Sequence, residues 1–299
     1  MNNKYYLGAT LVLMGGVFLS LSGIMIRHID QADGWQILFY RSLAYFISLT
    51  VILAVQYRSR TIEKFIAIGR PGIYASIVLA VGSVMYIMAM LNTTVANVVF
   101  IIGASPLITA LAGWLFLKEK ITRASFITML LAIGGIALMF ADGFVSGGML
   151  GNVFALMMVF MYMLFLLIMR HNRHIDMLPA TCLSGLVTAA IAFAFVDNLT
   201  VSQNDLILCI ALGSVQFGMG FMLLTWGTRY IPAAEVALFS LSESVLNPIW
   251  VWLGVNEVPS MLTLTGSAVV LISVVTYSIM AIRRERIVMT RLDQSHSAH

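Results

Sequence analysis

The chain has 299 residues, of which 60% are apolar and only 10% are charged, and its mean hydropathy is +0.96. Roughly 25% of the residues in a soluble domain are charged, so this composition excludes a soluble globular protein and indicates a membrane protein. The net charge of +4 does not by itself indicate a nucleic-acid partner, because membrane proteins concentrate Lys and Arg in their cytoplasmic loops. Cys182 and Cys209 lie in apolar stretches without metal-ligand or disulfide spacing, so no metal or other cofactor is expected.

The apolar runs predict ten transmembrane helices, each about the 20 residues that cross a hydrocarbon core of roughly 30 Å. In chain order they cover residues 6–26, 35–55, 71–91, 95–117, 123–141, 149–169, 178–196, 205–227, 232–254 and 260–282. The connections between them are too short to fold by themselves. Lys4, Ser20 and Ser22 resemble parts of a signal peptide, but the apolar run is too long for one, and we expect an uncleaved first helix.

The basic residues predict the orientation of these helices. Fifteen of the 17 Lys and Arg residues fall in the two terminal segments and in alternate connections, all on one predicted side. The other side has only Arg27, and Arg41 lies within a helix. Because cytoplasmic loops carry the excess of Lys and Arg, both termini are predicted to be cytoplasmic. The basic stretch RRERIVMTR near the C-terminus is expected to anchor this orientation, and anionic lipid headgroups are an alternative partner for it.

The tetrapeptide RHID occurs at residues 27–30 and again at 173–176, which raises the question of an internal repeat. A glycine followed 19 residues later by Arg-His spans the first predicted helix from Gly8 to Arg27, and the sixth from Gly151 to Arg170. In this alignment the second RHID lies three residues out of register. The tetrapeptide is therefore weak evidence, whereas the Arg-His pair occupies equivalent positions.

Stronger evidence for a repeat comes from two later segments. Residues 96–119 align without a gap to residues 234–257, and each segment ends in a glutamate, Glu119 or Glu257. The chain is therefore predicted to be five helices duplicated, and because five is odd, the second copy enters the membrane from the opposite side. The predicted division is a first repeat at 1–146, a second repeat at 147–286 and a cytoplasmic tail at 287–299.

These segments also resemble a known family. Two stretches resemble the ends of the two repeats of EamA proteins in the drug/metabolite transporter superfamily: AMLNTTVANVVFIIGASPLITALAGWLFLKEKIT and RYIPAAEVALFSLSESVLNPIWVWLGVNEVPS. The resemblance includes an arginine in the second helix, here Arg41 in FYRSL. The resemblance implies an all-α membrane protein of ten helices in two inverted repeats, with helices 1–4 and 6–9 around a cavity and helices 5 and 10 outside. In one place the chain departs from the family pattern: the second repeat usually has Glu-Pro in mid-helix, whereas here Glu243 is followed by Ser244, and a proline comes only at Pro248.

Charged groups inside the membrane are the first candidates for a substrate site, because a charge there costs roughly 2.5–3.5 kcal/mol or more. At 1.5 Å per residue, Arg41 lies about 10 Å from the outer helix end and Glu243 about 16 Å from the inner one. These similar depths allow the two side chains to pair or to hold opposite ends of a zwitterion. Glu243 is also a candidate for proton coupling, since it can alternate between protonated and ionised forms. The alternatives are a snorkelling Arg41 and a purely structural Glu243.

Uncharged residues complete the predicted site. Tyr86 and Gln216 lie on counterpart helices at depths a cavity would reach, and Asn247 lies beside Pro248. Pro106 and Pro248 free backbone carbonyls inside helices, which is tolerated only against protein or water, so both are expected to interrupt helices that line the path. A simple packing kink is the alternative for Pro106. The predicted substrate-binding residues are Arg41, Tyr86, Gln216, Glu243 and Asn247.

Two classes of function were compared. The favoured one is a secondary transporter of a small organic metabolite, an amino acid or a related compound, in a bacterial inner membrane. The alternative is an intramembrane enzyme acting on lipid or peptide, but the five histidines fall in loops or the tail and no HExxH motif occurs. The expected partners are a small-molecule substrate and membrane lipids, with no nucleic acid. Proton coupling and a homodimer stay open.

Overall fold

The structure is a computed structural model, and it describes residues 3–108, 110–111, 123–172, 175–227, 230–231 and 233–296. Every regular element in this part of the chain is helical, as the sequence predicts. Seven of these helices are long and apolar enough to cross a membrane. Two shorter apolar helices cover Val95–Ile108 and Phe126–Asp142.

The first half of the chain contains these elements: α1 (Asn3–Ser20), α2 (Ser22–Arg27), α3 (Gly34–Tyr57), the 3-10 turn η1 (Arg58–Arg60), α4 (Thr61–Ala67), α5 (Gly69–Asn92), α6 (Val95–Gly103) and α8 (Arg123–Ser146). The second half contains α9 (Met149–His171), α10 (Leu178–Phe195), α11 (Gln203–Ala211), the π-helical segment η2 (Leu212–Met219), α12 (Gly220–Gly227), α13 (Ala233–Val255) and α14 (Met261–His296).

Each predicted helix overlaps an observed one, with five informative differences. The first predicted helix divides at Leu21 into α1 and α2, and the eighth contains the π-helical segment η2. The short α4 was not predicted, and α14 continues well beyond the predicted end at residue 282. The fourth predicted helix, 95–117, is interrupted after Gly103, and its last residues lie outside the described ranges.

The packing of the helices is consistent with a duplicated fold. α1 packs against α12, and α5 packs against α9, which are the pairs that exchange when the first and second repeats are interchanged. In the same way, the contacts of α3 with η2 correspond to those of α10 with α5. Three further helices of the first repeat pack directly on their counterparts in the second: α3 on α10, α6 on α13, and α8 on α14. This set of contacts is what a twofold relation between the repeats produces.

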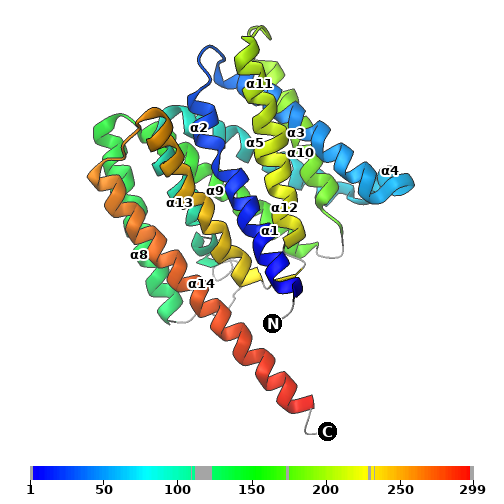
Figure 1. The fold of residues 1–299 in the computed structure, drawn as a ribbon, viewed down its shortest axis with the longest axis vertical. Coiled ribbons are helices and arrows are strands. Elements are labelled where there is room, and N and C mark those ends of the chain that lie inside the picture. The colour runs from blue at the N-terminus through cyan, green and yellow to red at the C-terminus, as the bar shows by residue number, and fades with distance from the viewer. Residues whose placement is uncertain are drawn as a thin grey trace.

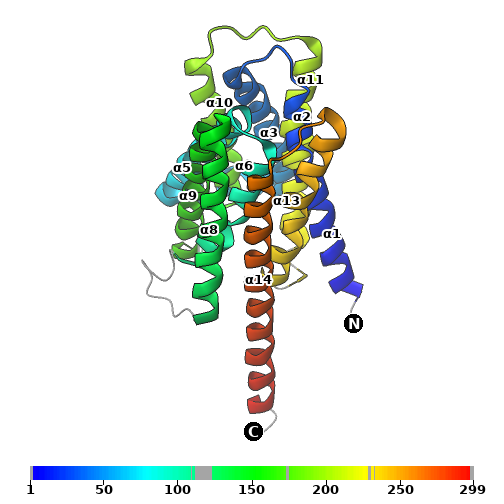
Figure 2. The same ribbon diagram turned by 90° about the vertical axis from the view of Figure 1, so that its left-hand side faces the viewer.

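α8 and α14 pack mainly on each other, along one side of the bundle (Figures 1 and 2). This agrees with the outer position expected for the fifth and tenth helices. The start of α1 and the end of α14 lie at the same end of the molecule, which we call the near end, and the α2–α3 connection lies at the opposite, far end (Figure 1). The near end is the one that the basic residues predict to be cytoplasmic.

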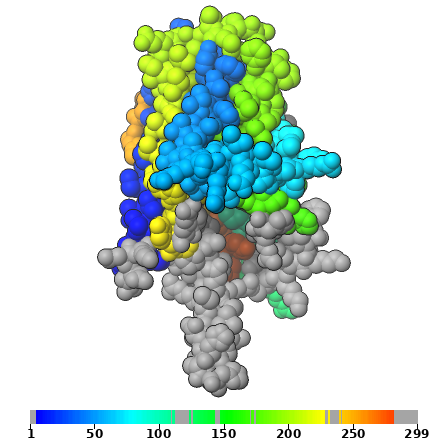
Figure 3. Space-filling view, turned by 90° about the vertical axis from the view of Figure 1, so that its right-hand side faces the viewer, coloured from blue at the N-terminus to red at the C-terminus, as the bar shows by residue number. Residues whose placement is uncertain are grey.

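The short helix α4 projects sideways from the bundle after α3 (Figures 1 and 3). Its Ile62 and Ile66 are 74% and 75% exposed, although α4 carries Lys64 and follows Arg58 and Arg60. A helix with exposed apolar residues among basic ones is typical of a segment that lies in the headgroup region of a membrane. This explains why a loop predicted to be short and polar contains a helix.

The main core of the bundle joins helices of both repeats. Its largest fully buried side chains include Ile37 and Leu38 of α3, Ile87 and Met90 of α5, and Ile101 of α6. Many large apolar side chains on the outer faces of the helices are exposed instead, as expected where lipid replaces water. The polar groups buried between these faces are therefore the exceptions that require an explanation.

Candidate functional site

The candidate site is built around the interruption between α1 and α2. Leu21 separates the two helices, and the Ser20 hydroxyl turns back to donate to the Val17 carbonyl at 2.7 Å. Serine hydroxyls compete in this way with the backbone hydrogen bonds of a helix. The Trp250 indole N–H of α13 donates to the Ser20 hydroxyl at 2.9 Å. A helix interruption inside a membrane is thus satisfied by side chains from its own segment and from the second repeat.

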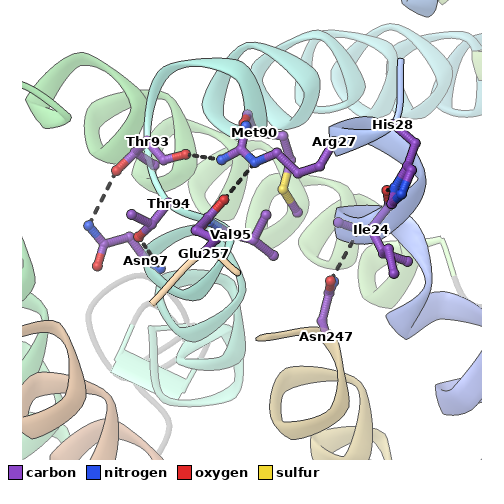
Figure 4. A network of polar contacts seen from close by, with 11 residues as sticks. Ile24, Arg27, His28, Met90, Thr93, Thr94, Val95, Asn97, Asn247 and Glu257 are labelled. Carbon is purple, nitrogen blue, oxygen red and sulfur yellow. Dashed lines mark hydrogen bonds and ion pairs between the residues drawn. The ribbon is translucent and has the colours of Figure 1, made fainter. Parts of the chain in front are cut away.

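Asn247 of α13 stabilises the start of α2. Its side-chain oxygen accepts the buried Gly23 N–H at 3.1 Å (Figure 4). Its side-chain N–H donates to the Ser22 hydroxyl at 2.9 Å. The first N–H groups of any helix lack partners within that helix, and Leu21 offers no side-chain cap. Asn247 therefore caps α2 from another helix. The predicted binding residue Asn247 has a structural contact in this conformation.

Tyr86 of α5 reaches the same point. Its hydroxyl donates to the Ser22 hydroxyl at 2.7 Å, so Ser22 accepts hydrogen bonds from both α5 and α13. This brings the first and second repeats together at the interruption between α1 and α2. The sequence predicted Tyr86 and Asn247 as site residues, but it gave no partner for either.

Gln216 lies in the π-helical segment η2. Its side-chain N–H donates to the Leu19 carbonyl at 2.9 Å, directly before the interruption, while its side-chain oxygen is buried without a hydrogen-bond partner among the described residues. π-Helical turns are rare and occur frequently at functional sites. Gly213 in η2 allows the segment to approach α3, because a Cβ atom there would lie 2.1 Å from the Arg41 carbonyl oxygen.

Arg41 is the most unusual group in the site, because it is only 5% exposed and forms no ion pair with a carboxylate of the described residues. Its guanidinium carbon lies 5.6 Å from the centre of the Tyr86 ring and 5.1 Å from that of Phe217. One terminal nitrogen, Nη1, donates to the Ser83 hydroxyl at 3.0 Å, whereas Nε has no partner in the described part of the chain. Aromatic rings attract a cation but accept no in-plane hydrogen bond, so these two rings leave the buried Nε donor of Arg41 unsatisfied.

Glu243 of α13 is half-buried and makes no hydrogen bond or ion pair with any described residue. It does not pair with Arg41, so the direct contact that their similar depths allowed is absent from this conformation. A Cβ atom at Gly16 of α1 would lie 3.7 Å from the Glu243 backbone nitrogen, so Glu243 lies beside α1, a few residues before the α1–α2 interruption. The structure therefore holds one buried cation and one carboxylate that do not neutralise each other.

The two prolines behave differently. α6 ends at Gly103, and a turn at Ala104 precedes Pro106, so the expected interruption is present there. Because proline has no N–H, it cannot bond the Ile102 carbonyl, and the Ser105 hydroxyl donates to that carbonyl instead.

The expected interruption at Pro248 is not seen. α13 runs continuously from Ala233 to Val255 with Pro248 inside it. The missing proline N–H leaves the Ser244 carbonyl without its usual helical donor, but the surrounding helix absorbs this without ending. The residue before it, Asn247, is fully buried and is the one in this segment that contacts the start of α2.

Sequence reasoning missed the serines that complete the site. Ser20 and Ser22 were noted only as residues that mimic a signal-peptide cleavage site, and Ser83 and Phe217 were not singled out. A signal was present, because Ser20, Ser22 and Gly23 gather three weak helix formers at one point of an apolar helix. Among the described residues, no three His, Cys, Asp or Glu side chains gather as a metal site would require.

The comparisons with known proteins agree with the fold. One solved crystal structure of a protein superposes with a TM-score of 0.65 at 15% identity, over 91% of this chain and 98% of that chain. That likeness shows the fold alone. No curated protein matches the chain. The EamA-like transporter family matches twice, at residues 6–141 and 149–279, which together cover nearly the whole chain. The chain therefore belongs to the EamA-like transporter family, a family of membrane transporters in the drug/metabolite transporter superfamily.

Proposed function

We propose that the protein is a secondary transporter of a small zwitterionic metabolite, an amino acid or a related compound, and that it works by alternating access between its two repeats. The observation that supports this proposal is the buried Arg41, whose Nε atom has no hydrogen-bond partner among the described residues, in the same interior as Glu243, which pairs with none of them either. A buried charge without a counter-ion is costly. A zwitterionic ligand would lower this cost, because its carboxylate can pair with Arg41 and its amine with Glu243.

The proposed roles follow from the chemistry of each side chain. The guanidinium of Arg41 presents parallel N–H donors in a plane, which suits a carboxylate. Tyr86 and Phe217 cover its faces and so restrict the ligand to the edge. The Glu243 carboxylate suits an amine. Gln216 contributes an unpaired acceptor, its side-chain oxygen.

Glu243 is also the group proposed to couple transport to protons. A lone carboxylate inside a membrane is costly in its charged form, so we expect it to carry a proton when the site is empty and to release it when an amine binds. The near end of the bundle is proposed to face the cytoplasm of a bacterial inner membrane. A homodimer is compatible with this proposal, which needs only one chain.

The intramembrane-enzyme alternative is not favoured, because the family to which the chain belongs consists of transporters. The proposed mechanism needs no cofactor. It depends on the movement of one repeat relative to the other around the site.

Two measurements test the proposal. Metabolite profiles of cells with and without the protein should differ in a zwitterionic compound, and vesicles containing the purified protein should exchange that compound. Arg41→Lys and Glu243→Gln should each reduce exchange, whereas Arg70→Gln, at an exposed position outside the site, should not. Exchange of a compound without a carboxylate, at equal rates in wild type and Arg41→Lys, would show that the proposed substrate class is wrong.

A further inference from the structure

At the far end of the bundle, Arg27 and Glu257 hold three segments together (Figure 4). The Arg27 Nε atom lies 2.7 Å from a Glu257 carboxylate oxygen, in the ion pair that the described residues form. The two terminal nitrogens of Arg27 donate to the Met90 carbonyl at 2.8 Å and to the Thr93 carbonyl at 2.7 Å. The second Glu257 oxygen accepts the Val95 N–H at 2.7 Å. We call these four contacts the far-end clamp.

The clamp satisfies backbone groups that would otherwise lack partners. The Met90 and Thr93 carbonyls lie at the C-terminal end of α5, and the Val95 N–H begins α6. Helix ends leave these carbonyls and N–H groups without helical partners. Arg27 and Glu257 supply them from two other segments, so separating the segments would expose these backbone groups and both charges at once.

Each segment of the clamp also carries a residue of the candidate site. Arg27 ends α2, whose first residue is Ser22. Met90 and Thr93 follow Tyr86 on α5, and Glu257 follows Asn247 just beyond the end of α13. The same three segments therefore meet twice, at Ser22 inside the bundle and at the clamp on its far end. The clamp contacts therefore connect the same three segments that carry Ser22, Tyr86 and Asn247.

The clamp is accessible to water, unlike the contacts beneath it. The Arg27 and Glu257 side chains are 24% and 21% exposed, whereas Asn247 is fully buried. Partly exposed ions can exchange their partners for water at a far lower cost than buried ones. The clamp contacts are short, but their ions stay partly hydrated, so the contacts can break and form again at a low desolvation cost.

The repeat supports a functional origin for the two residues. In the sequence, Arg27 corresponds to Arg170 and Glu257 to Glu119, so both residue types recur at equivalent positions of the other repeat. Glu119 and the side chain of Arg170 lie outside the described residues. A tie that merely stabilised one loop at the far end would not require the same pair of residue types in both copies.

We propose that the far-end clamp is the latch that closes the site toward the far compartment, and that transport requires Arg27 and Glu257 to separate. This inference rests on the proposed function, because it assigns the clamp to one half of an alternating-access cycle. It adds two residues that position the site without contacting the substrate. Neither residue was predicted from the sequence as part of the site.

Thiol labelling from outside the cell tests the latch without any substrate. The reporter is Val251→Cys, because Val251 is 1% exposed on α13 and packs against Gly23, between the clamp and the site. Cys182 and Cys209 are replaced by Ala in this chain. Val258→Cys, at a position 68% exposed at the far end, shows that the membrane-impermeant reagent reaches this side.

The latch predicts that Arg27→Gln and Glu257→Gln each raise the labelling rate of Val251→Cys by about tenfold or more, since each breaks a charged contact. Arg27→Lys should have an intermediate effect, because one ammonium cannot replace the planar fork. His28→Gln is the matched control, since His28 is exposed next to Arg27 and its ring hydrogen-bonds, among the described residues, to the Ile24 carbonyl and not to the clamp. It should leave the rate unchanged.

A separate chain that retains only the buried Cys182 reports on unfolding. It should remain slow to label in both clamp variants. An unchanged rate at Val251→Cys, or equal increases at Val251→Cys and Cys182, would identify the clamp as a structural tie and overturn the proposal. Because the readout needs no ligand, a failed latch and a wrong substrate class are distinguishable: the second appears only in the vesicle exchange.

Discussion

Asn247→Ala tests the assembly of the site through stability alone. Asn247 is fully buried and caps α2 from α13 through two contacts, with the Gly23 N–H and the Ser22 hydroxyl. The substitution removes both contacts and provides no replacement for the Gly23 donor. We therefore expect the substitution to destabilise the protein through the loss of these two hydrogen bonds.

The expected magnitude follows from the two contacts. An unpaired buried N–H costs about 1–3 kcal/mol. A side-chain hydrogen bond between membrane helices contributes about 0.6 kcal/mol on average. Together they predict a loss of about 2 kcal/mol in the free energy of unfolding. For a chain of this size, this lowers the melting temperature by about 4 °C.

The assay is thermal unfolding in detergent, with a double-mutant cycle. Asn247→Ala, Ser22→Ala and the double variant should show a coupling free energy of about 0.6 kcal/mol, because the two side chains share one hydrogen bond. Trp250→Phe is the control, since it removes the hydrogen bond to the Ser20 hydroxyl and leaves both Asn247 contacts in place. A melting temperature for Asn247→Ala within about 1 °C of wild type would refute the cap, as would a coupling free energy near zero.

The remaining predictions concern the cation, the carboxylate and the π-helical segment. Arg41→Lys should raise the KM for exchange by about tenfold while leaving the fold intact, because an ammonium loses the planar edge; an equal KM would contradict the carboxylate role. Glu243→Gln should abolish the pH dependence of exchange, measured between about pH 5 and 8, because the amide does not titrate; a retained pH profile would assign coupling elsewhere. Gly213→Ala should destabilise the protein by about 1–3 kcal/mol in thermal unfolding, since its Cβ would lie 2.1 Å from the Arg41 carbonyl oxygen; normal stability would mean that η2 shifts freely.

The helices and their packing were largely predictable from the sequence. A run such as residues 71–91 can only span a membrane as a helix, and α5 covers Gly69–Asn92. The alignment of 96–119 with 234–257 predicted that α6 and α13 occupy equivalent places, and the two helices pack on each other. These features depend on length, hydropathy and repetition, which are visible in one dimension.

The contacts within the site could not be predicted in the same way. Depth along a helix was sufficient to suggest Arg41 and Glu243, but depth does not specify the direction in which a side chain points. In the structure, the Arg41 guanidinium contacts the rings of Tyr86 and Phe217 and does not pair with Glu243. The interruption at Leu21 was missed for a related reason, since its capping groups come from α13, more than 200 residues away.

The Arg27–Glu257 pair illustrates a third limit. Arg27 stood out in the sequence as the one basic residue on its predicted side, and Glu257 as the end of a repeated segment. Each had a sufficient explanation by itself, the first in topology and the second in the repeat. Only the three-dimensional structure shows that the two residues bind each other and the ends of α5 and α6.

The two repeats are alike in their packing but differ where the site lies. α1 and α2 together correspond to α9, and the segment from α11 through η2 to α12 corresponds to α5. The α1–α2 segment is interrupted at Leu21, and the segment from α11 to α12 contains the π-helical turn η2, whereas their counterparts α9 and α5 are continuous helices. The two altered elements contact each other, since Gln216 of η2 bonds the Leu19 carbonyl. The proposed zwitterionic substrate has two different ends, so a site between two related repeats can distinguish these ends only if the repeats differ there. The break at Leu21 and the π-helical turn supply that difference, while the packing of the other helices stays common to both repeats, as the proposed alternating access requires.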